Sequence, residues 1–351
     1  MLKPSETAFF VVLQVMYKFL VIQTAFTGDV VLATAILEKI HQFYPDSQID
    51  FLLRKGNEGL LRDHPFITNL HIWDKRKQKK RNLLKMVMRV RKEQYTHIIN
   101  PHRFPTSGFM MFFSGAKYTA GFDKNPFAFS FTKKAPHVIA EPNATEYIME
   151  VERYQLLIED ITDKTAAQPK LYPTPGDYEK AKPYQDKPYI CIAPSSVWFT
   201  KRYPAERWAE LIDVLPPHYN IYLVGGPDDK ELAESILTLS GSERAINLSG
   251  KMNYLESCAL MQGADMNYTN DSAPLHFAVA MDAPVTGVFC STISSFGFGP
   301  THKKGRIVEI DYPLYCRPCG LHGRKRCPEG HFKCALDIKD EQLLWWISKA
   351  T

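Results

Sequence analysis

The chain has 351 residues, 45% of them hydrophobic and 23% charged, and a formal net charge of +5 at pH 7. This composition is typical of a globular protein and excludes a disordered or fibrous chain, while the length favours two domains of ordinary size. The modest positive charge permits an anionic partner but lies well below the charge density of a dedicated nucleic-acid-binding protein.

No segment reaches the roughly 20 apolar residues that a membrane-spanning helix needs. The nearest, AFFVVLQVMYKFLVIQTAF (8–26), is interrupted by Gln14 and Lys18 and lacks the small-residue cleavage site of a signal peptide. We therefore expect Met16 to be a natural start, with residues 1–15 an extension. Seven cysteines, an odd number, fit a reducing compartment, so a cytoplasmic protein is expected.

The first half of the chain alternates strand patterns with helix patterns. A strand is predicted over 18–24 (KFLVIQT), followed by a glycine turn and the helical pattern VLATAILEKIHQFYP. Further strands are predicted at 48–54, 69–73 and 96–101. Strands that alternate with helices pair in parallel and form a sheet that is covered on both faces.

The second half repeats this order after a segment rich in Pro, Lys and Asp. Strands are predicted at 189–194, 220–226, 245–250, 265–269, 284–289 and 306–310, and helices at 204–214, 228–240, 254–263, 273–281 and 339–349. We expect an α/β protein with two doubly wound, Rossmann-like domains that face each other across a cleft. The expected units are an N-terminal domain over 16–165, a linker over 166–187, a C-terminal domain over 188–338 and a final helical segment over 339–351.

The stretch YTNDSAPLH breaks a predicted strand with three residues that favour helix caps, Asn270, Asp271 and Ser272. A helix that starts here offers free backbone N–H groups and a positive dipole end to a phosphate. His276 lies on the same helical face as Ser272 and could donate to the same anion. Taken alone, the motif is more often an ordinary capped helix with a core histidine.

Two more loops of this half follow strands in the same way. PSSVWFTKRYP offers the hydroxyls of Ser195 and Ser196 and the point charge of Lys201. LVGGPDD places two glycines where a backbone can approach a ligand, with Asp228 able to bind ribose hydroxyls. Three such loops at the carboxyl side of one sheet favour a nucleotide diphosphate site over simple turns.

The first half has one comparable loop, TAFTGDVVLAT. Gly28 permits a tight turn, and Asp29 stands at a helix start, where a carboxylate is often only a cap. If Asp29 faces a nucleotide across a cleft, it becomes a candidate general base for an incoming hydroxyl.

A basic run, DKRKQKKR (74–81), carries six Lys/Arg against one Asp. Such a run is as often a solvated loop and helix face as a site. Its functional interpretation is attraction to a phosphate-bearing acceptor or to an anionic membrane surface.

Four cysteines cluster near the C-terminus with the spacing C-x2-C-x7-C-x6-C. Cys316, Cys319, Cys327 and Cys334 suggest a small structural zinc site, and a packed loop with reduced thiols is an equal alternative. Neither interpretation gives the segment a catalytic role.

The loops QTAFTGDVVLAT, KRYP and NDSAPLH together resemble those of the family 9 glycosyltransferases, the ADP-heptose:lipopolysaccharide heptosyltransferases and their relatives. The resemblance covers nearly the whole chain from about Met16. It implies the two-domain GT-B fold, with the acceptor in the N-terminal domain and the nucleotide sugar in the C-terminal domain. It also implies an inverting reaction that needs no metal.

Carried over position by position, the resemblance makes Asp29 the catalytic carboxylate and Lys201 the cation at the donor phosphates. It implies that Asp228 contacts the ribose and Met252 the base, while Ala273 replaces the glycine of the family pattern. The donor-binding residues are then Ser195, Ser196, Lys201, Asp228, Met252, Asp271, Ser272, Ala273 and His276. Residues expected on the acceptor side are Gly28, Lys75, Arg76 and Lys77.

The expected function is transfer of a heptose or similar sugar from an ADP-sugar to a lipid-linked lipopolysaccharide core at the inner membrane face. An alternative is transfer of another nucleotide sugar to a different cell-surface glycan. A two-domain nucleotide- or sugar-binding protein without activity would not need Asp29. A nicotinamide dehydrogenase is disfavoured because no G-x-G-x-x-G follows a predicted strand.

Overall fold

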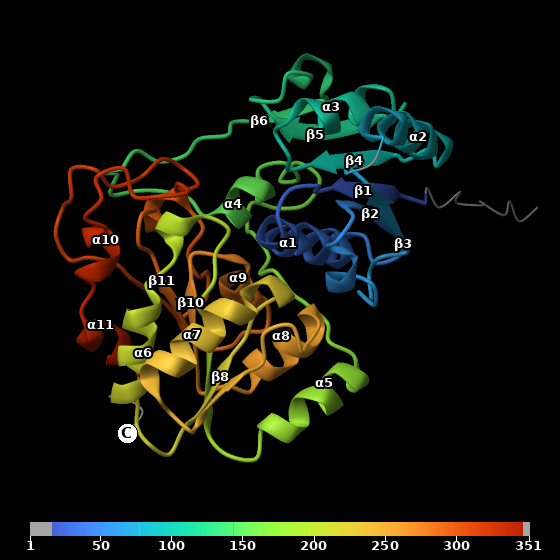
Figure 1. The fold of residues 1–351 in the computed structure, drawn as a ribbon. Coiled ribbons are helices and arrows are strands. Elements are labelled where there is room, and N and C mark those ends of the chain that lie inside the picture. The colour runs from blue at the N-terminus through green and yellow to red at the C-terminus, as the bar shows by residue number, and fades with distance from the viewer. Residues whose placement is uncertain (1–15, 77, 143, 347–351) are drawn as a thin grey trace, which may run out of the picture.

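A computed structural model of the chain describes residues 16–76, 78–142 and 144–346 (Figure 1). Its framework consists of two parallel six-stranded sheets, one in each half of the described chain. The strand orders are β3-β2-β1-β4-β5-β6 and β12-β11-β10-β7-β8-β9. Each order reverses beside its first strand, and parallel sheets bind ligands at the carboxyl ends of the strands at such a point.

The first sheet is built from short apolar strands and is covered on both faces. Its strands are β1 (Lys18–Ile22), β2 (Gln48–Arg54), β3 (Asn69–Trp73), β4 (His97–Asn100), β5 (Tyr118–Phe122) and β6 (Lys133–Ala135). Its helices are α1 (Thr27–Phe43), α2 (Lys79–Lys92), α3 (Pro105–Phe112) and α4 (Glu150–Gln155). Because strand side chains alternate, Phe19 and Val21 of β1 pack with α1, whereas Leu20 and Ile22 pack with α2 and α3.

The second sheet repeats this plan. Its strands are β7 (Tyr189–Ala193), β8 (Asn220–Leu223), β9 (Ala245–Asn247), β10 (Met266–Asn270), β11 (Val285–Val288) and β12 (Gly305–Val308). Its helices are α5 (Pro175–Ala181), α6 (Ala205–Val214), α7 (Lys230–Ser240), α8 (Tyr254–Gln262), α9 (Ala273–Ala280), α10 (Lys333–Leu336) and α11 (Asp340–Leu344). The 3-10 turns η4 (Phe199–Lys201) and η5 (Pro227–Asp229) follow β7 and β8. The carboxyl ends of β7 and β8 therefore lead directly into the two loops that the sequence predicts at a phosphate site.

The two halves contact each other through α1, α4 and α9, and Figure 1 shows α4 and α1 between the sheets. The backbone N–H of Glu150, at the start of α4, donates to the carbonyl of Gly297 at 2.8 Å. The Arg153 guanidinium, one turn later, donates to Glu150 at 2.6 Å and to the carbonyl of Phe296. The short helix α4 thus joins the first half of the chain to a loop of the second.

The predicted α/β class is confirmed, and so are the strands proposed at positions 48–54 and 69–73. The sequence patterns missed β5, β6, α3, α4 and α10. The segment expected to be a linker contains α5, which packs on α8 through a hydrogen bond from Tyr178 Oη to Gln262 Oε1 at 2.7 Å. All strands of the first sheet lie within 16–165 and all of the second within 188–338, although the boundaries themselves remain predictions.

Some expectations fall outside the described residues. Residues 1–15, expected to be an extension, and residues 347–351, the end of the final helical segment, are not described; the described part of that segment contains α11. Among the helices that the structure describes, none has the length and apolar character needed to cross a membrane.

Candidate active site

A cavity of about 240 Å³ lies between the two halves of the chain and brings most of the predicted site residues together. The first half contributes Phe26, Thr27, Gly28, Asp29, Leu32 and Arg54. The second half contributes Ser196, Val197, Trp198, Lys201, Asp271, Ser272, Ala273, His276, Ile293, Phe296, Phe298, Leu321 and His322. The cavity therefore has a carboxylate on one wall and a group of polar and basic side chains on the other.

Asp29 stands in the first turn of α1, and its carboxylate accepts the backbone N–H of Phe26 at 3.0 Å. Burial, followed by the nearby Glu150 carboxylate, raises the pKa of Asp29 to about 6. The hydrogen bond from Phe26 and the charge of Arg54 act in the opposite direction. A carboxylate with a pKa of about 6 is ionised at pH 7 and is a stronger base than an ordinary Asp, which suits proton abstraction.

Lys201 and Asp271 form an ion pair on the opposite wall, with 2.6 Å between Nζ and Oδ2 and side chains only 15% and 8% exposed. The Thr292 hydroxyl donates to the same oxygen of Asp271 at 2.6 Å. The ion pair fixes the ammonium group of Lys201 beside the cavity, and the Lys201 side chain is largely buried. A fixed cation in a partly desolvated site is suited to bind a phosphate.

The expectation of three consecutive caps is wrong. The Asn270 side chain accepts the N–H of Tyr203 at 2.8 Å and donates to the carbonyl of Pro194 at 2.6 Å. Ser272 is the N-cap of α9, but its hydroxyl makes no capping bond. Asn270 and Asp271 instead connect the end of β10 to neighbouring loops, because tertiary partners compete successfully with the helix terminus for these side chains.

His276 is buried in the first turns of α9 and lines the cavity. Burial, together with the charge of Lys201, lowers the pKa of His276 to about 4, although Asp271 acts in the opposite direction. The imidazole is therefore neutral at pH 7. It can supply a hydrogen bond at the cavity but no positive charge, and its predicted contact with the donor anion remains a prediction.

Gly28 approaches α9 so closely that a side chain would collide with it. A Cβ at Gly28 would lie 2.8 Å from Cδ2 of His276 and 3.6 Å from Cα of Ala273. The glycine is thus required by the contact between the two halves of the chain. Its predicted contact with the acceptor remains a prediction.

Three predicted donor residues do not line the cavity. Ser195 lies beside it, Asp228 is exposed in η5, and Met252 is half-buried in the loop after β9. The loops after β8 and β9 do meet, because the N–H of Gly250 donates to the carbonyl of Gly225 at 2.9 Å. The nucleoside contacts of Asp228 and Met252 therefore remain predictions.

A basic side pocket of about 220 Å³ adjoins the cleft and shares Thr27 and Arg54 with it. It is lined by Thr27, Arg54, Lys55, Gly56, Asn57, Lys75, Arg76 and Tyr254. The Lys75 ammonium donates to the carbonyl of Thr24 at 2.7 Å, and burial, followed by the charge of Arg54, lowers the pKa of Lys75 to about 8. Two of the predicted acceptor residues thus meet in one pocket, while Lys77 lies outside the described residues.

The cysteine-rich segment contributes directly to the cleft, which its sequence pattern did not indicate. Leu321 and His322 line the cavity. Arg324 exchanges two hydrogen bonds with Thr200: its N–H donates to the Thr200 hydroxyl at 2.8 Å, and its carbonyl accepts the Thr200 N–H at 3.1 Å. Because Thr200 precedes Lys201 in η4, this segment supports the turn that carries the cation.

The structure gives no support to a zinc site in the same segment. The sulfur of Cys316 lies 3.9 Å from Nε2 of His331, and the Cys319 thiol is directed at the Cys316 carbonyl. All seven cysteines are free. Within the described ranges, no group of three or more His, Cys, Asp or Glu residues is arranged to hold a metal ion.

The sequence patterns missed three residues that shape the site. Arg54 ends β2, so its place at the carboxyl edge of the sheet could have identified it. Glu150 raises the pKa of Asp29, but it belongs to a short helix after a long irregular segment. His322 lies in a segment whose cysteines directed attention to a metal instead.

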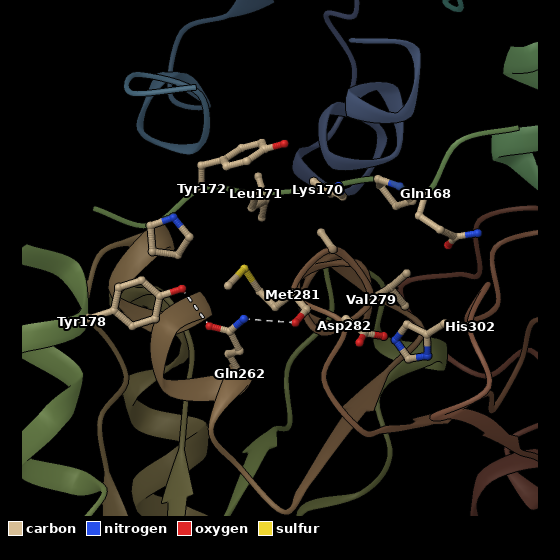
Figure 2. Close-up of a pocket in the computed structure, with 13 residues that line it drawn as sticks. Gln168, Lys170, Leu171, Tyr172, Tyr178, Gln262, Val279, Met281, Asp282 and His302 are labelled. Atoms are coloured by element: carbon tan, nitrogen blue, oxygen red, sulfur yellow. Dashed lines mark hydrogen bonds between the residues drawn. The ribbon is translucent and has the colours of Figure 1, made fainter. Parts of the chain in front are cut away.

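A larger cavity, of about 490 Å³, lies at the other end of α9 (Figure 2). Its walls are the segment 168–173, Tyr178, Gln262, the end of α9 with Asp282, and His302. Figure 2 shows Tyr172, Leu171 and Lys170 on one side and Gln262 and Met281 on the other. It contains none of the loops that follow the strands at the cleft, so the smaller interdomain cavity is the better candidate for catalysis.

Comparison with known proteins identifies the family of this chain. A family model described as "Glycosyltransferase family 9 (heptosyltransferase)" matches residues 83–327. Lipopolysaccharide heptosyltransferase 3 of Escherichia coli is 24% identical over 280 residues, which cover 76% of this chain and 82% of the relative.

Solved structures of similar proteins have the same fold. The glycosyl transferase family 9 protein of Veillonella parvula superposes with a TM-score of 0.80 at 20% identity, over 95% of this chain and 96% of that one. The E. coli heptosyltransferase WaaC with ADP-2-deoxy-2-fluoro heptose superposes with a TM-score of 0.69 at 18% identity, over 95% and 100%. The expected GT-B arrangement is thereby confirmed. With a family match over well more than half of its length, the chain is a glycosyltransferase and belongs to glycosyltransferase family 9 (heptosyltransferase).

Proposed function

We propose that this enzyme transfers a heptose from ADP-heptose to a lipopolysaccharide core acceptor, with inversion at the anomeric carbon and without a metal ion. The observation that carries the proposal is the placement of Asp29 in the same cavity as the Lys201–Asp271 pair. A base on one wall and a fixed cation on the other are the two groups that a displacement at a sugar diphosphate requires.

On the acceptor side, Asp29 removes the proton of the attacking hydroxyl. The resulting oxygen attacks the anomeric carbon from the face opposite the diphosphate, so the configuration inverts. A pKa of about 6 favours this step, because the carboxylate is ionised at neutral pH and still has useful basicity. Arg54 lines the same cavity and is close enough to lower the pKa of Asp29, so it would also help to position an anionic acceptor.

On the donor side, negative charge grows on the diphosphate as the bond to the sugar breaks. Lys201 supplies a fixed positive charge, and the start of α9 supplies its dipole and an N–H group at Ala273. His276 adds a neutral hydrogen-bonding group. We assign the diphosphate to these groups and propose that they act in place of a divalent metal.

A lipopolysaccharide core acceptor is favoured by the similarity to lipopolysaccharide heptosyltransferases and by the basic side pocket. Lys75 and Arg76 stand beside Arg54 in that pocket, where the charged groups of a phosphorylated core sugar would be neutralised. ADP-heptose is favoured as donor because the related WaaC was solved with ADP-2-deoxy-2-fluoro heptose. The enzyme would then work in the cytoplasm at the inner membrane.

The first experiment is a thermal-shift panel against ADP, GDP, UDP and dTDP, with magnesium or with a chelator. Stabilisation by ADP alone that is unchanged by the chelator and lost in Lys201→Ala supports the donor assignment. Preference for another nucleotide would favour a different sugar and another cell-surface glycan. If no nucleotide stabilises the protein, the diphosphate assignment is wrong.

Transfer itself is tested with ADP-heptose and a deacylated core acceptor. The anomeric configuration of the product, measured by NMR, should be opposite to that of the donor. Nucleotide binding without any transfer to the acceptor would favour a non-catalytic sugar-nucleotide-binding protein.

A further inference from the structure

An apolar and basic surface, formed by residues that do not line the cavity, covers the outer face of the first sheet. Large apolar side chains stand in solvent on α2, on α3 with the residue after it, and on the turn η2 (Ala128–Ser130). They are Leu84 (58% exposed), Met88 (66%), Phe112 (48%), Phe113 (40%) and Phe129 (73%). We call this set the α2–α3 surface. Clusters of exposed apolar groups on a soluble domain mark an interaction site.

The aromatic part of this surface is one continuous group of rings. Phe112 has its ring centroid 4.9 Å from that of Phe113 and 6.0 Å from that of Phe129. Helix α2 is attached to the same group, because the Arg91 guanidinium donates to the carbonyl of Phe113 at 3.2 Å. Leu84 and Met88 are four residues apart and therefore lie on one side of α2. The two helices are therefore connected, and both present apolar side chains to solvent.

The charge of α2 is of one sign. Its sequence, KKRNLLKMVMRVRK, contains seven Lys or Arg residues and no Asp or Glu. Among the described residues, no carboxylate forms an ion pair with a cation of this helix. Lys85 and Arg89 flank Leu84 and Met88 along the exposed side. A helix with apolar groups bordered by unpaired cations is suited to an anionic bilayer surface.

The orientation of this surface also fits a bilayer. α1, on the other face of the sheet, packs against α9 of the second half, whereas α2 and α3 lie on the face turned away from that half (Figure 1). Phe104 and Arg103 precede α3 at the carboxyl end of β4, the end of the sheet at which the cleft opens. A bilayer against α2 and α3 would leave the second half of the protein in water.

A second copy of this chain fits the surface less well. Most homodimers pair the same patch on both subunits. Such a contact would bring the seven cations of α2 towards their own copies, with no acidic side chain on the helix to neutralise them. We therefore infer that the α2–α3 surface docks the enzyme onto an anionic phospholipid bilayer. This inference concerns a surface outside the active site and does not rest on the identity of donor or acceptor.

The test is co-sedimentation of the full chain with extruded vesicles of phosphatidylglycerol and phosphatidylcholine, and with vesicles of phosphatidylcholine alone. We expect binding to the anionic vesicles that weakens as salt is raised, and at least tenfold weaker partition onto the neutral ones. The variants are Phe112→Ser/Phe113→Ser/Phe129→Ser and Lys80→Gln/Lys85→Gln/Arg89→Gln. Each should lower partition onto anionic vesicles by about tenfold or more, because the first removes apolar area that would enter the bilayer and the second removes cations that anionic lipids attract.

The matched control is Val214→Ser/Leu239→Ser, which removes two exposed apolar groups from the second half and should bind as the wild type does. Equal melting temperatures confirm that the surface variants fold. Failure of the wild type to bind anionic vesicles, or full binding by both surface variants, overturns the inference. So does a wild-type dimer that the Phe variant dissociates without any vesicle binding. Because the vesicles contain no acceptor, these outcomes are independent of the nucleotide and transfer experiments.

Discussion

The ammonium group of Lys201 lies 2.6 Å from the carboxylate of Asp271, and the two side chains are among the least accessible charged groups of the cleft. The pair joins η4 to the end of β10, two loops that are 70 positions apart in the sequence. A buried ion pair of this kind adds little net stability, but removal of one partner leaves the other uncompensated. Catalytic and structural effects of a substitution here must therefore be separated by design.

Lys201→Met should lower kcat by at least about 10²-fold, because a single lost group that stabilises transition-state charge typically costs 10²–10³. It should also destabilise the fold, since Asp271 would be left without its partner. The double variant Lys201→Met/Asp271→Asn should recover most of that stability without recovering turnover. Melting temperatures and kcat on the same preparations check both parts. If the double variant also regained wild-type turnover, Lys201 would have no catalytic role.

Asp29 should control the acid limb of the pH–rate profile. Its pKa of about 6 predicts that kcat/KM rises about tenfold per pH unit below 6 and levels off above it. Asp29→Asn should remove this limb and should lower kcat/KM by at least about 10²-fold. No other carboxylate in the described part of the chain lines the acceptor wall of the cavity and could replace it. A profile measured over pH 4.5–8 tests this. An unchanged limb in the variant would assign the titration to another group.

Asp29 should also reduce the stability of the folded protein at neutral pH. Folding raises its pKa from 3.8 to about 6, so the folded state favours the protonated form. The contribution of Asp29 to stability is therefore most favourable below about pH 4 and is lost as the pH rises through 6. Asn cannot ionise but can still accept the Phe26 N–H. Asp29→Asn should thus be more stable than the wild type by up to about 3 kcal/mol at pH 7, since the rise is about two pKa units and one unit corresponds to about 1.4 kcal/mol.

Denaturant unfolding at pH 4 and pH 7 checks this difference. The gain should disappear at pH 4, where the wild-type carboxyl group is protonated. Equal gains at both pH values would mean that the substitution acts through packing and not through ionisation.

Substitution of His322 should affect binding of the donor and should leave the ionisation of Asp29 unchanged. It lines the cavity, and after burial the charges of Arg103 and Lys201 lower its pKa, so it is a neutral group between the two halves. His322→Ala should weaken ADP binding or raise the donor KM by about tenfold, while the Asp29 limb of the pH profile stays in place. His331→Ala, in the same segment but outside the cavity, is the control. Equal losses in both variants would indicate that the segment acts only through its fold.

The strand-and-helix pattern was sufficient to predict the edge of the sheets where the site lies. Asp29, Lys201 and Asp271 each follow a buried strand, and the carboxyl ends of parallel strands share one edge. Their convergence therefore follows from topology, once two facing sheets are assumed. The partners of these residues depend on tertiary contacts that have no sequence period.

Two failures show the limit of local patterns. Asn270 has a strong preference for helix caps, yet its side chain connects Tyr203 to Pro194, because both backbone groups lie within reach only in the folded state. Glu150 raises the pKa of Asp29 from a distance of 121 positions in the sequence. No spacing rule connects such a pair.

The contact between Gly28 and His276 limits how the two halves can move. Because a single methyl group would already collide with the imidazole, α1 and α9 leave no spare room at this point. If the two halves closed further, they would have to rotate about this contact, and such a rotation would move the outer rim of the cleft more than Asp29, which is next to Gly28. Such a rotation would change the width of the rim more than the separation of Asp29 from the start of α9.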